Sequence, residues 1–342
     1  MFILFCSICK TTSNTFRLSR SWEEFYPDTP YNQAIETKDP FTYQTNNYYY
    51  INNVIFDNLT SQAIYGNSVA IHTVIEDSTF TYITSTSTSQ GGAIYLTNSI
   101  ELNQKKICSC NCWTKNSGQY MYLSAGYKSV KTILSSFTSC GNLSSGNGIL
   151  AGVNVMNYAT NLNFSKCETY SASAFSYNYC KNPSNISFGN FEHCASKLDS
   201  VLKKSGSLGS HYLQINDCTI YNCSVDNKLI YFEGATSILN SNFINNVLRT
   251  STSPTLIYTT GRMIISSCYI ESNQDFSAAN FQTSDLRDSA LELNNQYYII
   301  TKCIEFKNEE VKKTFVEESN VIKVYSGREK ILIEPILIFY SC

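Results

Sequence analysis

The residues best suited to bind a metal are three closely spaced cysteines. Cys108, Cys110 and Cys112 alternate along one segment, and in a strand this spacing would place all three thiols on one face, about 6.5 to 7 Å apart between neighbours. No second cysteine pair at zinc-finger spacing accompanies them, and the three histidines of the chain form no zinc-binding motif. We therefore expect these thiols to serve the core or an edge strand, and we predict neither a metal nor another cofactor.

Carboxylates that could do acid–base chemistry are sparse along most of the chain. Glycoside hydrolases need two converging carboxylates, and polysaccharide lyases need a base together with acids that bind Ca²⁺. Within the repeated coils Glu76 and Asp77 are the only adjacent acidic pair before the C-terminal cap, whereas Asp217, Asp226 and Glu233 are dispersed. Turns and solvation account for such isolated acids, so we predict no catalytic residue.

The overall composition excludes one class of partner and favours a polar, weakly charged surface. Charged residues make up 15% of the 342 residues and hydrophobic residues 43%, with a net charge of −2. Nucleic-acid binding requires clustered Lys and Arg, so we predict no nucleic-acid partner. No apolar run reaches the roughly 18 to 20 residues of a membrane-spanning helix, so we predict no transmembrane helix.

A repeat organises most of the chain, and it is clearest in Leu213 to Phe232. Apolar or small residues stand at offsets −5, −2, 0 and +3 from an apolar anchor, and this pattern recurs at a period of 20 to 50 residues, which is typical of solenoids. The predicted anchors are Phe56, Phe80, Trp113, Phe137, Phe164, Phe191, Ile220, Phe243 and Ile270.

The spacing within each repeat predicts three short strands. Offsets −2 and 0 lie on one face of a strand, while the odd step from −5 to −2 requires a tight bend between two strands. A third apolar segment follows each anchor after a loop of variable length. We therefore predict an all-β, right-handed parallel β-helix of about nine to ten coils with a period of about 27 residues. A leucine-rich repeat fits less well, because leucine is sparse at the repeat positions.

A column of small residues is predicted at offset +3, where neighbouring coils would stack. Asparagines there could pass amide hydrogen bonds between coils, and cysteines could fill the same slot as small buried hydrophobes. Parallel Cβ vectors on adjacent coils suit the disulfide dihedral poorly, so we favour free thiols over cross-links. The column comprises Asn116, Cys140, Cys167, Cys194, Cys223, Asn246 and Asn273, preceded by Leu59 and Ile83.

Three regions follow from this pattern. Residues 1–48 lack the repeat and form an N-terminal segment, which begins with a weak signal-peptide-like stretch and continues as a cap. Residues 49–308 form the β-helix. Residues 309–342 are rich in charges of both signs, as expected of a polar C-terminal cap that protects the open end of a solenoid.

Five N-glycosylation sequons bear on the compartment of the protein. They are weak evidence in so asparagine-rich a chain, but together with the apolar N-terminus they favour an extracellular or cell-surface location over a cytoplasmic one. The acceptor residues are Asn58, Asn142, Asn163, Asn185 and Asn222.

Short motifs give the chain a resemblance to known surface proteins. Gly91 to Tyr95 reads GGAIY, and the F-x-x-N and W-x-x-N motifs end at Asn246 and Asn116. These motifs resemble the repeats of polymorphic outer-membrane-protein-like families and of β-helix surface proteins of protists. The likeness covers about residues 49 to 308 and implies extracellular display and adhesion. It departs from those families in having GGAI once and no recognisable anchor.

These observations favour a non-enzymatic surface or secreted protein that binds a glycan or a protein. The 25 tyrosines, clustered at Tyr48–Tyr50 and Tyr297–Tyr298, suit contact with sugars and proteins, although they could equally cover the sheet. The longest insertion, Gln274 to Ser289, is the predicted recognition loop. A polysaccharide-cleaving enzyme of the pectate-lyase type with an unrecognised site and an intracellular scaffold are the alternatives.

Overall fold

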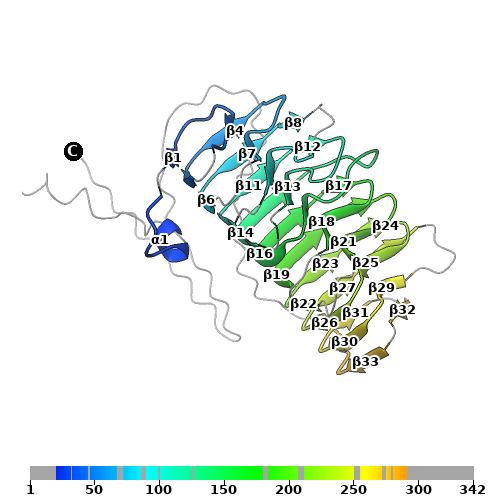
Figure 1. Ribbon diagram of the computed structural model, residues 1–342. Coiled ribbons are helices and arrows are strands. Elements are labelled where there is room, and N and C mark those ends of the chain that lie inside the picture. Colours follow the sequence, from blue (N-terminus) through cyan, green and yellow to red (C-terminus); the bar gives the residue numbers. More distant parts are fainter. Residues whose placement is uncertain are drawn as a thin grey trace, which may run out of the picture. The chain divides into compact units, whose positions relative to one another are not determined.

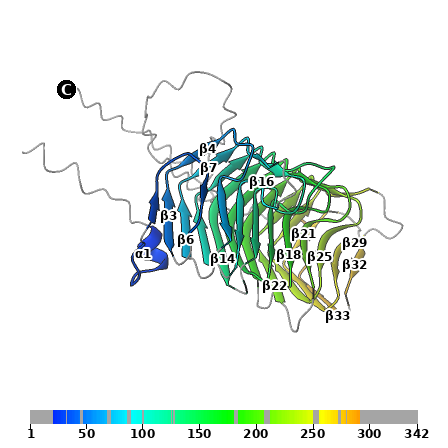
Figure 2. The same cartoon turned by 45° about the horizontal axis from the view of Figure 1, so that its top comes forward.

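The computed structural model describes residues 21–290, apart from gaps at 32, 45–46, 68–71, 86–89, 99–100, 125, 127, 180–183, 207–211, 250–254, 272–274 and 279. Within these residues the strands follow one another as parallel ribs, with successive coils side by side in sequence order (Figures 1 and 2). The predicted fold class is confirmed: the protein is an all-β parallel β-solenoid with a period of about 27 residues.

We call each coil of the solenoid a rung. The rungs contribute strands to a large parallel sheet, here called sheet A. It contains β1(Gln33–Ile35), β3(Tyr48–Asn52), β4(Ile55–Asp57), β6(His72–Glu76), β7(Thr79–Thr81), β10(Glu101–Lys105), β11(Cys108–Cys110), β14(Ser129–Thr138), β16(Met156–Ser165), β19(Ser184–Glu192), β22(Tyr212–Asn216), β23(Thr219–Tyr221), β26(Ala235–Leu239), β27(Asn242–Ile244), β30(Arg262–Ser266), β31(Tyr269–Ile270) and β33(Asn280–Ser284).

A second parallel sheet, sheet B, forms another side of the solenoid, and two short sheets join the two sides. Sheet B contains β2(Phe41–Thr42), β5(Ile64–Asn67), β9(Ile94–Thr97), β13(Met121–Ser124), β15(Leu150–Val153), β18(Ala172–Asn178), β21(Ser200–Ser205), β25(Lys228–Phe232), β29(Thr255–Thr259) and β32(Asp275–Ser277). The short sheets pair β8(Thr84–Ser85) with β12(Trp113–Thr114), and β17(Glu168–Thr169), β20(Ala195–Ser196), β24(Ser224–Val225) and β28(Val247–Leu248).

Left-handed residues make the bends that separate these sides. The predicted bend between offsets −5 and −2 is confirmed, because the residue at −3 has a positive φ in every rung, as at Asn53 (56°) and Asp217 (52°). A second bend at offset +2, as at Asn58 (54°) and Asn222 (49°), was not predicted. Asn and Asp tolerate this conformation better than most residues, which explains their frequency at these positions.

The anchor residues form a buried aromatic column inside the solenoid. Phe137, Phe164 and Phe191 pair in register, and their stacked rings lie 4.8 and 5.3 Å apart. All of the phenylalanine anchors are at most 2% exposed. The register places Ile220, Phe243 and Ile270 in the same column, as predicted.

Trp113 is not an anchor, which corrects the prediction for its coil. Ser109 lies between Phe80 and Phe137 in the register, whereas Trp113 pairs with Thr84 in a short sheet. The missing ring at Ser109 is replaced by Tyr120, which directly precedes β13 of sheet B: Tyr120 is fully buried, and its ring lies 5.2 Å from both Phe80 and Phe137. The predicted pattern required an apolar residue at the anchor position, and Ser109 is polar.

The small-residue column changes with the corrected register. Cys112, rather than the predicted Asn116, occupies offset +3 from Ser109, so the cysteine column comprises Cys112, Cys140, Cys167, Cys194 and Cys223. All five are fully buried free thiols. Asn246 continues the column, where its Nδ2 donates to the Ile220 carbonyl (2.8 Å) and its Oδ1 accepts from the Cys223 amide (3.0 Å). Asn273 lies outside the described residues.

The solenoid has about seven turns, so the prediction of nine to ten coils is too high. The prediction counted each anchor as a full turn. The segment from Gln274 to Ser289 was expected to be a loop, but it contains β32 and β33, which extend the sheets there; its role in recognition stays a prediction.

A short helix packs on the outside of the first rungs. In α1(Ser21–Phe25), Trp22 is 2% exposed and packs against Tyr50 and Val74 on the outer side of sheet A. Strands β1 and β2 from the same N-terminal segment pair with β3 and β5. The predicted C-terminal cap, residues 309–342, lies outside the described residues.

Candidate functional site

The outer face of sheet B carries one column of residues held in parallel register. Strand alternation places this column outward, because its neighbours in the sequence, such as Ile64 and Gly66, are buried inside the solenoid. We call it the outer column. Its members are Tyr65, Tyr95, Tyr122, Ala151, Ser176, Lys203, Tyr231 and Tyr258.

Three tyrosines at the N-terminal end of the outer column form the first stack. The ring centroids of Tyr65 and Tyr95 lie 5.3 Å apart, and those of Tyr95 and Tyr122 lie 5.8 Å apart, with interplanar angles of 15° and 12°. Tyr65 is 37% exposed. Partial burial, followed by the neighbouring Tyr65, raises the pKa of Tyr95 above its ordinary value. The Tyr95 phenol is therefore neutral near pH 7 and can both donate and accept hydrogen bonds.

Two tyrosines near the other end form the second stack, which also holds charged groups. The rings of Tyr231 and Tyr258 lie 5.4 Å apart and are almost parallel, at 2°. Lys228 Nζ lies 4.8 and 4.6 Å from their centroids, a cation–π arrangement. The Tyr231 hydroxyl donates to Glu233 (2.6 Å). Burial first, and then Glu233, raises the pKa of Tyr231, so this phenol is also neutral.

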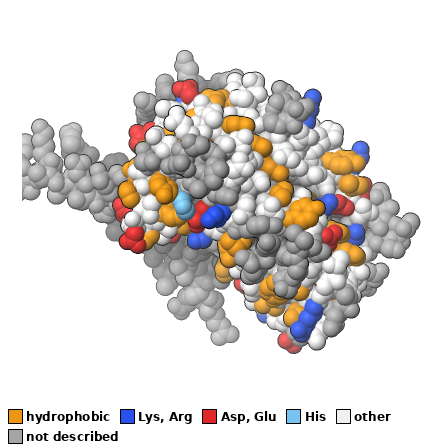
Figure 3. Space-filling model, viewed as in Figure 1, with side chains coloured by type: hydrophobic (Ala, Val, Ile, Leu, Met, Phe, Trp, Pro, Cys, Tyr) orange, Lys and Arg blue, Asp and Glu red, His pale blue; other side chains and the backbone are white. Residues whose placement is uncertain are grey.

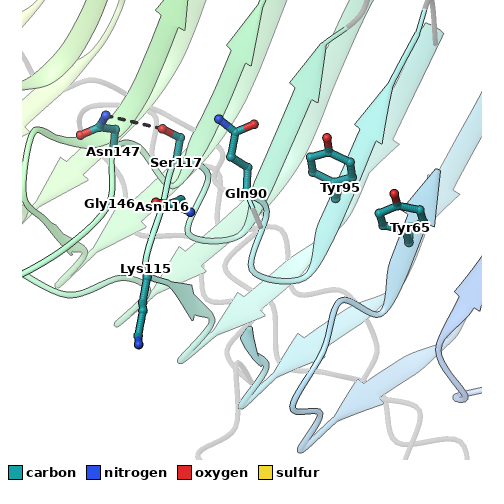
Figure 4. Close-up of a pocket in the computed structure, with 8 residues that line it drawn as sticks. All are labelled: Tyr65, Gln90, Tyr95, Lys115, Asn116, Ser117, Gly146 and Asn147. Carbon is teal, nitrogen blue, oxygen red and sulfur yellow. Dashed lines mark hydrogen bonds between the residues drawn. The ribbon is translucent and has the colours of Figure 1, made fainter. Parts of the chain in front are cut away.

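A pocket of about 500 Å³ lies beside the first stack (Figure 4). Loop ends that precede the strands of sheet B supply most of its polar groups, while the two tyrosines come from neighbouring strands. The lining residues are Tyr65, Gln90, Tyr95, Lys115, Asn116, Ser117, Gly146 and Asn147. This volume lies within the usual range for ligand pockets.

Backbone pairing between successive loops holds this lining in place. The Gly91 amide donates to the Ser117 carbonyl (2.9 Å), and the Gly118 amide donates to the Asn147 carbonyl (2.8 Å). Gly91 has φ +77°, a left-handed conformation that favours glycine at the turn before β9. In Figure 4 the Asn147 side chain points toward Ser117, and its Nδ2 lies 3.5 Å from the Ser117 hydroxyl.

The pocket can form hydrogen bonds and ring contacts. Amides and hydroxyls offer donors and acceptors, and Lys115 adds one cation. Among the eight described lining residues there is no carboxylate. On the face seen in Figure 3, uncharged polar atoms and hydrophobic side chains predominate over charged ones.

The acidic residues considered for catalysis have structural roles. Glu76 is 6% exposed and accepts a hydrogen bond from the Tyr50 hydroxyl (2.9 Å). Asp77 occupies a left-handed bend and pairs with Lys106 (3.2 Å). Neither residue lines the pocket.

The three closely spaced cysteines do not share one face, which corrects the strand-based expectation. Ser109 points into the core with Phe80 and Phe137, so alternation places Cys108 and Cys110 on the opposite side of the strand. The left-handed bend at Asn111 (φ 53°) then turns Cys112 inward. Cys218 is a core thiol elsewhere in the solenoid. Burial raises its pKa to about 12, which makes it a poor nucleophile at neutral pH.

The sequons fall into two environments. Asn58 and Asn142 lie exposed at bends, and the Asn142 side chain accepts hydrogen bonds from Ser144 (2.8 Å). Asn163, Asn185 and Asn222 are partly buried. Asn163 accepts a hydrogen bond from the amide of Asn190 on the next rung (2.8 Å).

Two of the three tyrosines in the first cluster singled out in the sequence are not exposed. Tyr49 and Tyr50 are buried, and Tyr297–Tyr298 lie outside the described residues. The outer column was missed, although its pattern is visible in the sequence. In five coils a tyrosine directly follows the apolar residue that marks the third segment: Ile64-Tyr65, Ile94-Tyr95, Met121-Tyr122, Ile230-Tyr231 and Ile257-Tyr258. Aligning the repeats on that segment would have shown the column.

No family model, curated protein or solved structure matches the chain. Among the described residues, no helix has both the length and the apolar composition to cross a membrane.

Proposed function

We propose that the protein is a non-catalytic binding protein whose ligand is a glycan, and that the pocket and the first tyrosine stack form its binding site. The observation that carries this proposal is the combination, in one pocket, of two phenol groups from sheet B with amides and a hydroxyl from the loop ends that precede its strands. Sugars present many hydroxyl groups and weakly apolar ring faces, and they are bound by such mixtures of polar groups and aromatic rings.

The alternative of polysaccharide cleavage gains less support from this site. Hydrolysis by the common mechanism requires two carboxyl groups separated by about 5 to 9.5 Å across the glycosidic bond. The eight described lining residues offer no carboxylate, and Lys115 is their only strongly basic side chain. Binding without turnover is therefore the function that the chemistry of the pocket favours.

A glycan array followed by titration calorimetry tests this proposal. We expect retention of at least one glycan class, no release of reducing ends or unsaturated uronates, and about tenfold weaker binding by Tyr95→Ala, which corresponds to about 1.4 kcal/mol. Tyr158→Ala is the control, because Tyr158 is an exposed tyrosine on sheet A that lies outside both the pocket and the outer column. Cleavage products, or the absence of any retained glycan, would refute the proposal.

We also propose display outside the cell, as the resemblance of the repeats implies. The exposed bends at Asn58 and Asn142 support it, because a glycan attached there would extend into solvent. Expressed in its own cell, a C-terminally tagged copy should lose mass on glycosidase treatment and be cleaved by protease added to intact cells. The double variant Asn58→Gln/Asn142→Gln should remove most of the mass shift. A protected copy of unmodified mass would contradict display.

A further inference from the structure

The two tyrosine stacks lie on the same line of the same sheet face. Strand pairing relates each member of the outer column to the next, so Tyr65 and Tyr258 are separated by seven rungs, or about 34 Å at about 4.8 Å per rung. Tyr122 and Tyr231, which end the stacks that face each other, are separated by four rungs, or about 19 Å. Both stacks therefore face the same direction in a fixed spacing.

The positions between the stacks carry no ring. Ala151 and Ser176 have short side chains that are 2% and 6% exposed. Lys203 follows them, and its Nζ is held by Asp199 (2.5 Å) and Ser171 (3.1 Å). The column thus has tyrosines at both ends and none at the three positions between them.

The second stack is not needed to fill the core. The residues that precede its two tyrosines, Ile230 and Ile257, are fully buried, whereas Tyr231 and Tyr258 are only partly buried on the opposite face of their strands. Lys228 keeps its ammonium beside both rings, and no ion pair is formed by it within the described part of the chain. Aromatic edges, hydroxyls and one cation are therefore presented in a fixed arrangement.

We infer that the ligand is an extended linear glycan that contacts both stacks at once; this inference rests on the proposed glycan-binding function. One stack offers a single weak contact. When two weak contacts are joined by one ligand, the second contact forms at a high effective concentration, and affinity rises by about 10²- to 10⁴-fold once the ligand can span both sites. A rigid solenoid holds the two stacks at the spacing that this gain requires.

The test measures affinity against ligand length. The full-length chain is titrated with cello-oligosaccharides, oligogalacturonates and heparin-derived oligosaccharides of about two to ten units, a series that brackets the spans of about 19 and 34 Å. We expect affinity for one series to rise by at least about 100-fold between fragments that reach one stack and fragments that reach both.

Variants separate the two stacks. Tyr258→Ala should abolish the rise with length but leave the affinity for the shortest bound fragments unchanged, whereas Tyr95→Ala should weaken binding at every length. Tyr258→Phe keeps the ring and should retain most of the rise, which guards against loss through misfolding. Tyr158→Ala, on sheet A, should match the wild type.

The outcomes distinguish this inference from the function on which it rests. Equal affinity per mole for short and long fragments, with binding still sensitive to Tyr95→Ala, would overturn the extended ligand and leave the glycan-binding pocket intact. A length dependence that survives Tyr258→Ala would also overturn it. If fragments of no length and no chemistry bind, the proposed function itself fails, and this inference fails with it.

Discussion

Two columns of aromatic rings run along this solenoid, one inside it and one outside sheet B. The inner phenylalanine column is at most 2% exposed, whereas Tyr65 in the outer column is 37% exposed. Ring spacing is nevertheless similar: 4.8 to 5.3 Å between stacked phenylalanines and 5.3 to 5.8 Å between stacked tyrosines. The rung spacing of the sheet sets the stacking in both columns, and the face decides whether the rings stabilise the fold or remain available for contact.

The two columns also differ at the positions where an aromatic ring is missing. Where Ser109 interrupts the inner column, Tyr120, which directly precedes β13, fills the space between Phe80 and Phe137. An unfilled gap in a core would leave a cavity and cost stability. Where Ala151 and Ser176 interrupt the outer column, the sequence supplies no ring in their place. Dense packing is thus maintained inside, while the outer face tolerates a break.

The largest expected contrast is in stability. Phe164→Ala should lower the free energy of unfolding by about 3 to 5 kcal/mol, because it removes a buried ring and leaves a cavity between two rungs. Tyr95→Ala should cost about 1 kcal/mol, because it loses mainly stacking on a half-exposed face. Urea denaturation followed by circular dichroism measures both values.

The comparison depends on the difference between these two values. Tyr158→Ala supplies the baseline for an exposed tyrosine outside the outer column, and we expect it to change stability by about 0.5 kcal/mol or less. If Tyr95→Ala destabilised the protein as much as Phe164→Ala, the outer column would be part of the folding core, and its availability for a ligand would have to be abandoned.

The fold class was predictable because the repeat acts through backbone geometry. Strand alternation and the odd step between offsets −5 and −2 required a bend, and Asn53 and Asp217 supply it in the left-handed conformation. The register of one coil was not predictable, because Ser109 carries no anchor-like side chain and the ring that replaces it, Tyr120, is eleven positions further along the chain. Packing across the core decided this position, and spacing along one strand could not show it.

The candidate site was less accessible to sequence reasoning than the fold. Tyrosine clusters drew attention to Tyr49 and Tyr50, which the N-terminal segment and the first rungs bury. The outer tyrosines are separated by a full coil in the sequence, so only the alignment of the third strand brings them together. The pocket depends in addition on loop ends whose lengths differ between coils, and no periodic pattern specifies those.

A smaller effect on stability tests whether Tyr120 fills the space that Ser109 leaves in the inner column. Tyr120→Ala should be destabilising because it opens a cavity between Phe80 and Phe137, and Ser109→Phe alone should be destabilising because it overpacks the same space. Combined, the two changes should compensate, since the new phenylalanine would continue the register from Phe80 to Phe137. We expect the double variant to be about 1 to 3 kcal/mol more stable than the sum of the single effects predicts, measured by a double-mutant cycle of urea denaturation. Additive losses would mean that Tyr120 and Ser109 do not share one space, and that the inner column is interrupted rather than repaired.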